Sequence, residues 1–359
     1  MTAVCTRSKE RNCRGRDLGP LVRSLDLAHL VHESSKSGTA RLLGRVSDGL
    51  KEFTAPAASF SVNSFAALSR CRNLRRLNLT IVFQPLPMVS LLRAVKGLPH
   101  LSTMHLPARM EWENHNSNDL LRMLHDPAGP RKLLASQVLP GTFFHPDEMP
   151  SLSSLICQFH NHDGFGMFLA VLLEIWGIKL RCLVVGYCET DDSLHSHHGW
   201  HLCQIMKSCP SLEDLDIPRF FLATGDIFSS TDFLPFYGFV PRRDFPLTVL
   251  TLRVPIFDQE DPTWVVEDLV MHLKRGMLPN LLRVEISEDI LQCQDQERKL
   301  LVEDMGFQGI QSDIELNRFQ ANDALAMHDL IRLLEKNEDE AKRLGISKGR
   351  LPGVWTFSE

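Results

Sequence analysis

A short phrase, L-x-x-L-x-L with its apolar positions loosely occupied, recurs nine times along the chain. The apolar triplets are Val22/Leu25/Leu27, Leu50/Phe53/Ala55, Leu74/Leu77/Leu79, Leu101/Met104/Leu106, Leu152/Leu155/Cys157, Leu180/Leu183/Val185, Leu212/Leu215/Ile217, Leu247/Leu250/Leu252 and Leu281/Val284/Ile286. Successive copies begin 24 to 35 residues apart, except for one interval of 51 residues that hides a degenerate copy near Leu133 to Leu139. Such a period indicates stacked repeats, because one unit this short cannot bury its own apolar face.

Each phrase predicts a short strand, because its last two apolar residues are two apart, which is the period of a strand with one buried face. Between the phrases, apolar spacing of three and four predicts helices over residues 88–98, 118–125, 200–207 and 262–274. Strand and helix in alternation predict an α/β leucine-rich-repeat solenoid, with a curved parallel sheet inside and helices outside. The alternative is a doubly wound α/β sheet, whose strands would be longer and more apolar.

The chain divides into four predicted segments. A basic N-terminus over residues 1–17 is expected to be disordered, and the solenoid follows over 18–290. Charged amphipathic helices over 291–347, the second beginning after an Asn322 cap, are expected to cover the last repeat. The tail over 348–359 is expected to be loose, although Trp355 could dock.

Composition restricts the class of protein. The chain is 43% hydrophobic and 23% charged, which is the balance of a folded globular protein. Its formal net charge of −5 argues against nucleic acid as the main partner. The nine cysteines are an odd number, which predicts reduced thiols and a location in the cytoplasm or nucleus. The longest apolar run, over residues 167–176, is too short to cross a bilayer, so no membrane association is expected.

The residues between the apolar positions are predicted to form a ladder across the inner surface of the solenoid. The candidate protein-binding residues are Arg76, Asn78, His105, Gln158, Asp214, Asp216, Arg253, Arg283 and Glu285. Acidic positions 214 and 216 are followed in sequence by basic positions 253 and 283, and such a mixed surface suits a protein or peptide partner through electrostatic complementarity. The alternative is that these are solvated strand residues with no binding role.

A rival site lies in the segment 188–203, which holds four histidines and two cysteines. His197, His201 and Cys203 are the candidate zinc ligands, because imidazole and thiolate are the groups that zinc favours. The cysteines do not form the usual closely spaced pair, so the alternative is a polar loop between repeats with no metal. A zinc-binding or enzymatic protein built around this loop is the second functional hypothesis.

No cofactor is expected, and the chain is predicted not to be an enzyme. It contains no phosphate-binding loop, no G-x-S-x-G, no H-E-x-x-H and no G-x-G-x-x-G after a strand.

Cys71 and Cys209 occupy the same place in their repeats, three residues before Leu74 and Leu212. This shared phase predicts buried structural thiols and not nucleophiles.

The segments 69–79 and 207–217 resemble the C-x-x-L-x-x-L-x-L junctions of cysteine-containing leucine-rich repeats in F-box proteins, and 18–27 is similar to the first repeat of many fungal proteins of that kind. The resemblance covers about residues 18–290. It implies that the repeats form the substrate-receptor arm of a cullin-RING ubiquitin ligase, in which an N-terminal F-box docks the adaptor. The phrases begin near Leu18, which leaves no room for an F-box upstream in this sequence, so adaptor binding is expected only if an F-box is missing from it.

Overall fold

The computed structural model describes residues 19–30, 37–111, 150, 152–160, 165–188, 202–218, 245–253, 265–276, 278–287, 310–343 and 352–357. These residues form an α/β protein with parallel sheet structure, as the sequence predicts. The chain divides into two compact units, residues 1–180 and 181–359, which we call the N-terminal and C-terminal units.

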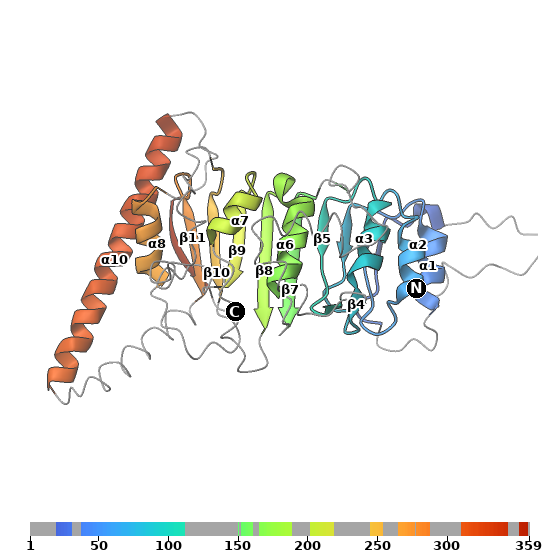
Figure 1. Ribbon diagram of the computed structural model, residues 1–359, viewed down its shortest axis with the longest axis horizontal. Coiled ribbons are helices and arrows are strands. Elements are labelled where there is room, and N and C mark those ends of the chain that lie inside the picture. The colour runs from blue at the N-terminus through green and yellow to red at the C-terminus, as the bar shows by residue number, and fades with distance from the viewer. Residues whose placement is uncertain are drawn as a thin grey trace, which may run out of the picture. The chain divides into compact units, whose positions relative to one another are not determined.

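In the N-terminal unit, short strands alternate with helices along the chain (Figure 1). The elements are η2 (Gly19–Leu21), β1 (Ser24–Asp26), α1 (Gly38–Val46), β2 (Glu52–Thr54), α2 (Val62–Leu68), β3 (Arg76–Asn78), β4 (Leu86–Pro87), α3 (Met88–Lys96), β5 (Thr103–His105), β6 (Met110–Glu111), β7 (Ser154–His160), α6 (Phe165–Trp176) and η5 (Gly177–Lys179). Strands β1, β2, β3, β5 and β7 pair in parallel in that order, and β4 pairs separately with β6.

The C-terminal unit repeats the same alternation. Its elements are β8 (Cys182–Cys188), α7 (Leu202–Ser208), β9 (Asp214–Pro218), β10 (Val249–Arg253), α8 (Val265–Lys274), β11 (Arg283–Ser287), α10 (Ile310–Arg343) and β12 (Gly353–Phe357). Strands β8 to β12 pair in parallel in chain order. All nine sequence phrases therefore coincide with a parallel strand, which confirms the strand prediction.

The middle apolar residue of each phrase lies in a common register row within its unit. In the N-terminal unit this row is Leu25, Phe53, Leu77, Met104 and Leu155. In the C-terminal unit it is Leu183, Leu215, Leu250, Val284 and, from β12, Val354. In the second to ninth phrases all three apolar residues are buried, so the phrase is the core of the fold.

A repeated backbone contact fixes the start of the strands. In each phrase, one residue lies two positions before the middle apolar residue. In most phrases its backbone carbonyl accepts hydrogen bonds from two consecutive amides of the next repeat. The Arg23 carbonyl, for example, accepts from the Lys51 and Glu52 amides at 2.7 and 3.0 Å. The carbonyls of Lys51 and Arg75 do the same for the next two repeats, and those of Arg181, Glu213 and Thr248 do so in the C-terminal unit. Stacking thus uses backbone groups, and it occurs here with Arg, Lys, Glu and Thr at the accepting position.

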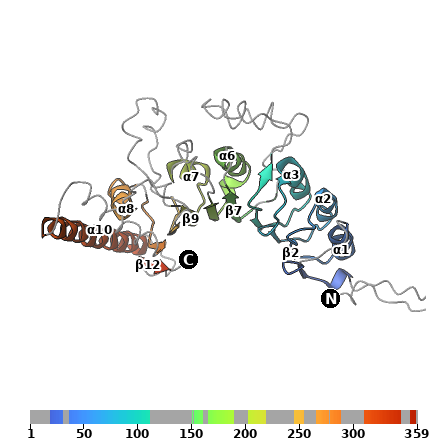
Figure 2. The ribbon, with the colours of Figure 1, turned by 90° about the horizontal axis from the view of Figure 1, so that it is seen from below.

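Helices α1, α2 and α3 form one layer of the N-terminal unit, and the strands form a second layer beside them (Figure 2). Their buried faces have helical spacing, as in α3, where Met88, Leu91, Leu92 and Val95 are fully buried. The predicted helix over 88–98 is confirmed by α3, which is capped at Gly97. The predicted helix over 118–125 lies outside the described residues.

The start of helix α10 differs from the prediction for the second cap helix, whereas the first predicted cap helix lies outside the described residues. Helix α10 is continuous over 34 residues, and Asn322 lies inside it instead of capping its start. Amphipathic spacing continues through this position, and asparagine is tolerated within a long helix at a small cost in propensity. The helix packs against α8 and β12, and the Asn337 Nδ2 donates to the Leu278 and Leu281 carbonyls at 3.1 and 3.0 Å. The predicted segment boundaries at 17 and 290 lie outside the described residues.

The predicted loose tail contains an ordered strand. Residues 353–357 form β12, which pairs in parallel with β11 and places Val354 beside Val284. The segment Val354-Trp355-Thr356-Phe357 is rich in β-branched and aromatic residues, which favour strands and which outweigh its terminal position.

None of the helices in the described part of the chain combines the length and apolar character that crossing a membrane requires.

Candidate functional site

The polar residues of strands β9 to β11 come together on one face of the sheet in the C-terminal unit. Side chains two apart on a strand share a face, so the apolar phrase residues lie on one side and the intervening residues on the other. The register places Asp216 beside Thr251, and Thr251 beside Glu285. We call the group Asp216, Thr251, Arg253, Arg283, Glu285 and Trp355 the strand-face cluster.

Asp216 and Arg253 form the first ion pair of this cluster. The Arg253 Nε donates to both carboxylate oxygens of Asp216, at 2.8 and 2.9 Å. The Asp216 side chain is only 15% exposed and that of Arg253 is 41% exposed. Burial raises the pKa of Asp216, and Glu285 raises it further, whereas the Arg253 guanidinium opposes the rise. The ion pair is therefore partly buried, so the cost of removing both charges from water offsets part of the attraction between them.

Arg283 and Glu285 form a second ion pair on β11, two residues apart on the same face. Their Nη2 and Oε1 atoms are 2.7 Å apart, and the Thr251 hydroxyl donates to the other Glu285 oxygen at 3.1 Å. Thr251 itself is only 8% exposed. Glu285 is thus fixed from two strands, which holds Arg283 in one orientation.

Trp355 completes the cluster from β12. The Arg283 guanidinium carbon lies 4.3 Å from the centroid of the Trp355 ring, a cation–π geometry. The register pairs Trp355 with Glu285, so the indole stands beside the carboxylate that orients Arg283. The site prediction missed this aromatic residue, although alternation after Pro352-Gly353 was a usable strand signal.

This arrangement is suited to recognition. Arginine and tryptophan are the side chains that most often dominate binding energy at protein interfaces, and here they are stacked and oriented in advance. The flanking carboxylates of Asp216 and Glu285 place negative charge and hydrogen-bond acceptors beside them. Of the predicted site residues, Asp216, Arg253, Arg283 and Glu285 belong to the cluster, while Asp214 lies two residues before Asp216 on β9, in register with Val249.

The predicted residues of the N-terminal unit are not joined in the same way. Arg76 approaches Glu52 at 3.8 Å, with both side chains about half exposed. Burial lowers the pKa of His105, and the charge of Arg76 lowers it further. The Asn78 Oδ1 accepts from the Thr80 amide and hydroxyl at 3.0 and 2.6 Å, so it serves the turn that follows β3.

Gln158 does not occupy the ladder position that was predicted for it. His105 is in register with Ile156, and Gln158 lies two residues farther along β7 and is exposed. Strand β7 spans seven residues, so Gln158 lies beyond the three positions that pair with β5. The ladder therefore has an apolar residue, Ile156, at this step.

The candidate zinc segment cannot be assembled from the described residues. Cys188 ends β8 and Cys203 lies in α7, whereas His195, His197, His198 and His201 fall outside the residues that the structure describes. Within the described part of the chain, no group of three or more His, Cys, Asp or Glu side chains is placed to hold a metal ion. The zinc hypothesis stays a prediction.

The cysteines of the shared repeat position are buried thiols. Cys71 and Cys209 have no exposed surface. Burial raises the pKa of Cys71 to about 11, with a smaller contribution from Asp48, and raises that of Cys209 to about 12. Burial also raises the pKa of Cys157. Such thiols stay protonated and unreactive at neutral pH, in agreement with a packing role.

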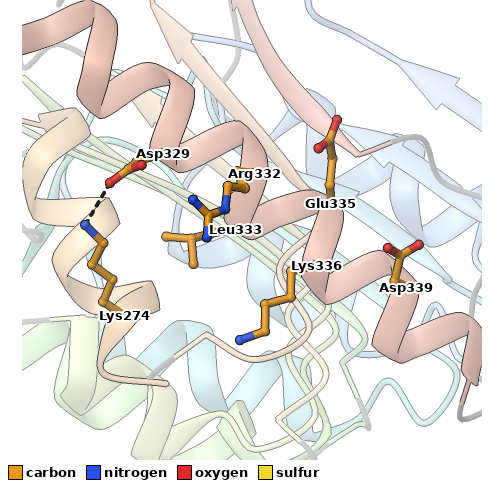
Figure 3. Close-up of a pocket in the computed structure, with 7 residues that line it drawn as sticks. All are labelled: Lys274, Asp329, Arg332, Leu333, Glu335, Lys336 and Asp339. Atoms are coloured by element: carbon orange, nitrogen blue, oxygen red, sulfur yellow. Dashed lines mark hydrogen bonds and ion pairs between the residues drawn. The ribbon is translucent and has the colours of Figure 1, made fainter.

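A shallow charged groove lies between α8 and α10. It is lined by Lys274, Asp329, Arg332, Leu333, Glu335, Lys336 and Asp339 (Figure 3). The Lys274 Nζ donates to Asp329 at 2.8 Å, and this hydrogen bond lowers the pKa of Asp329. The lining alternates in sign, and the Lys274–Asp329 ion pair joins α8 to α10 across the groove.

Comparison with known proteins gives one short similarity. The chain is 29% identical over 87 residues to Protein pof5 of Schizosaccharomyces pombe, a stretch that covers 24% of this chain and 25% of that protein. The chain thus matches about a quarter of the length of this curated relative. No family model matches the sequence.

Proposed function

We propose that this protein is a non-enzymatic interaction scaffold of the leucine-rich-repeat type, which binds a protein partner through the polar face of its strands. The repeat assignment is supported by nine phrases that coincide with nine strands, by pairing in chain order within each unit, and by helices α1 to α3 on one side of the strands. In such a solenoid the face opposite the helices is the concave, accessible surface.

The observation that carries the proposal is the stacking of Arg283 on Trp355 between two ion pairs. Four successive strands, β9 to β12, each contribute a side chain, so the cluster exists only when they are aligned. A rigid aromatic and guanidinium surface loses little conformational entropy when a partner covers it.

A finer proposal is that the partner is a substrate of a cullin-RING ubiquitin ligase. Its support is the resemblance of the two C-x-x-L-x-x-L-x-L junctions to the repeats of F-box proteins, together with the buried thiols that occupy both junctions. Capture of the ligase adaptor by the purified chain would support it. Failure to bind adaptor, with other partners retained, would leave the scaffold proposal and show that this chain does not dock the adaptor by itself.

The central test compares proteins captured by the full chain and by an Arg253→Ala/Arg283→Ala/Trp355→Ala variant. A matched control is Lys207→Ala/Arg332→Ala/Ile331→Ala, which removes two cations and one apolar side chain from exposed positions of α7 and α10. We expect the amount of each specific partner that the strand-face variant captures to fall by about tenfold or more, as it does when hot-spot side chains are truncated. We expect the control to keep them.

Circular dichroism at matched concentrations would verify that both variants are folded. An unchanged set of captured proteins in the strand-face variant would refute the proposed binding face. Equal loss in both variants would refute it as well, because the effect would then belong to the surface in general.

A further inference from the structure

The N-terminal unit carries a concentration of positive charge that the whole chain does not. Residues 37–111 contain ten Lys and Arg against three Asp and Glu, whereas the full chain has a formal net charge of −5. Such asymmetry indicates a surface for an anionic partner. The question is whether the charges are scattered or aligned.

Three of them are aligned by the repeat. Arg23, Lys51 and Arg75 occupy the same position of the first three phrases, two residues before the middle apolar residue. Their backbones stack directly, because the Lys51 amide donates to the Arg23 carbonyl and the Arg75 amide to the Lys51 carbonyl, both at 2.7 Å. All three residues are exposed. We call them the basic row, and at the usual strand separation it spans about 10 Å.

The fold leaves this charge largely uncompensated. The Arg23 Nη1 donates to the Gly49 carbonyl at 3.2 Å, and a neutral acceptor does not cancel its charge. The side chains of Lys51 and Arg75 make no hydrogen bond or ion pair within the described part of the chain. Like charges in adjacent repeats repel, and this repulsion is not offset by ion pairs to the three side chains within the described part of the chain.

We propose that the basic row binds an acidic segment of a protein partner, one rich in Asp and Glu. Arginine is suited to carboxylates because its planar guanidinium can donate two parallel hydrogen bonds. About three residues of an extended peptide span the row. This surface shares no residue with the strand-face cluster, so it extends the proposed function and can fail independently of it.

Single-stranded nucleic acid is the less favoured occupant. Such binding relies on aromatic side chains that stack with the bases. Of the four aromatic residues in 37–111, Phe53, Phe60 and Phe65 are buried. The exposed one, Phe83, follows β3, whereas Arg75 precedes it, so the two lie toward opposite ends of that strand.

The test uses a fluorescein-labelled peptide of alternating Glu and Ser, with a Gln and Ser peptide as the neutral probe, measured by fluorescence anisotropy with the full chain. We expect the Glu peptide to bind, the Gln peptide not to bind, and the affinity to fall as salt rises. Lys51→Glu/Arg75→Glu should weaken binding by about tenfold or more, since both contacts become repulsive. Lys51→Gln/Arg75→Gln should give a smaller loss.

The matched control is Arg41→Glu/Arg93→Glu, which makes the same change of charge at exposed positions of α1 and α3. We expect it to weaken binding by less than about threefold, as a long-range effect of net charge. Equal losses in the two charge-reversal variants would overturn the proposal, and so would absence of Glu-peptide binding. Tighter binding of a single-stranded oligonucleotide of equal charge would overturn it in favour of nucleic acid. The Gln variant, which removes the charge without reversing it, keeps the test decisive if charge reversal impairs folding.

Discussion

The two units build the same strand from the same phrase and then use its polar face differently. In the C-terminal unit, the side chains of neighbouring strands bind one another, through Asp216–Arg253 and through Thr251, Glu285, Arg283 and Trp355. In the N-terminal unit they serve their own turns, as Asn78 does, form a long and half-exposed ion pair, as Arg76 and Glu52 do, or remain exposed, as in the basic row. The repeat therefore fixes the backbone and leaves the surface chemistry free to diverge between units.

The largest predicted effect tests whether the cores of the two units are equivalent. Leu77→Ala and Leu250→Ala each remove a side chain with no exposed surface from the middle of a phrase. Each should lower the free energy of unfolding by about 3 kcal/mol, the cost of a buried cavity. Urea unfolding combined with hydrogen exchange of peptides from each unit would measure it. A loss below about 1 kcal/mol in either variant would show that its phrase is not a core strand.

The second prediction concerns glycines that the two units need for different reasons. A Cβ at Gly49 would lie 2.1 Å from the Pro20 carbonyl oxygen, whereas Gly276 has a φ of +71° and open space around it. Gly49→Ala should cost about 2 kcal/mol through this backbone clash. Gly276→Ala should cost about 1 kcal/mol through its left-handed conformation.

Gly44→Ala is the control for both. Gly44 lies in α1 with nothing near its Cβ position, so alanine should stabilise the protein by about 0.5 kcal/mol. Thermal unfolding of the three variants would rank them. A tolerated alanine at Gly49 would contradict the close approach of η2 to the start of β2.

The third prediction separates the paired face from the exposed one. Trp355→Ala should cost about 2 kcal/mol, because it removes the indole that stacks on Arg283. Arg76→Ala should cost less than about 0.5 kcal/mol, because its ion pair with Glu52 is long and solvated. Equal effects in chemical denaturation would contradict the contrast between the two faces.

The fourth prediction is a pH dependence of opposite sign in the two units. The pKa of His105 is lowered in the folded state, so its contribution to stability is lost as pH falls below the ordinary value of 6.5. The pKa of Asp216 is raised, so its contribution declines as pH rises above the ordinary 3.8. NMR titration of both side chains would test this, and a His105 midpoint above 6.5 or an Asp216 midpoint below 3.8 would contradict it.

The smallest expected effect concerns metal. If the segment 188–203 is a polar loop between repeats, a chelator should change the thermal midpoint of the protein by less than about 1 °C, since no structural metal is removed. Elemental analysis of the purified protein gives the complementary measurement. Stoichiometric zinc that disappears in His197→Ala or Cys203→Ala would favour the metal hypothesis over the loop.

Sequence patterns located more of this fold than of its candidate site. The nine phrases predicted every strand from β1 to β11 that belongs to the main pairing, because alternation and repeat phase are local signals. The ladder prediction included Arg253 and Arg283 but placed Gln158 one step too far and omitted Trp355. Register decides such details, because the positions of β7 that pair with β5 end at Ile156 and Gln158 lies two residues farther on.

Sequence alone determined that the nine phrases are strands and that their apolar residues are buried, since the period of two and the shared spacing of the phrases require a common apolar face. Tertiary structure alone decided that β12 would pair with β11 and bring Trp355 over Arg283. The physical reason is the distance along the chain over which each property is decided. Burial at each phrase depends on a few neighbouring residues, whereas the partner of a side chain across strands depends on where a distant segment returns along the chain.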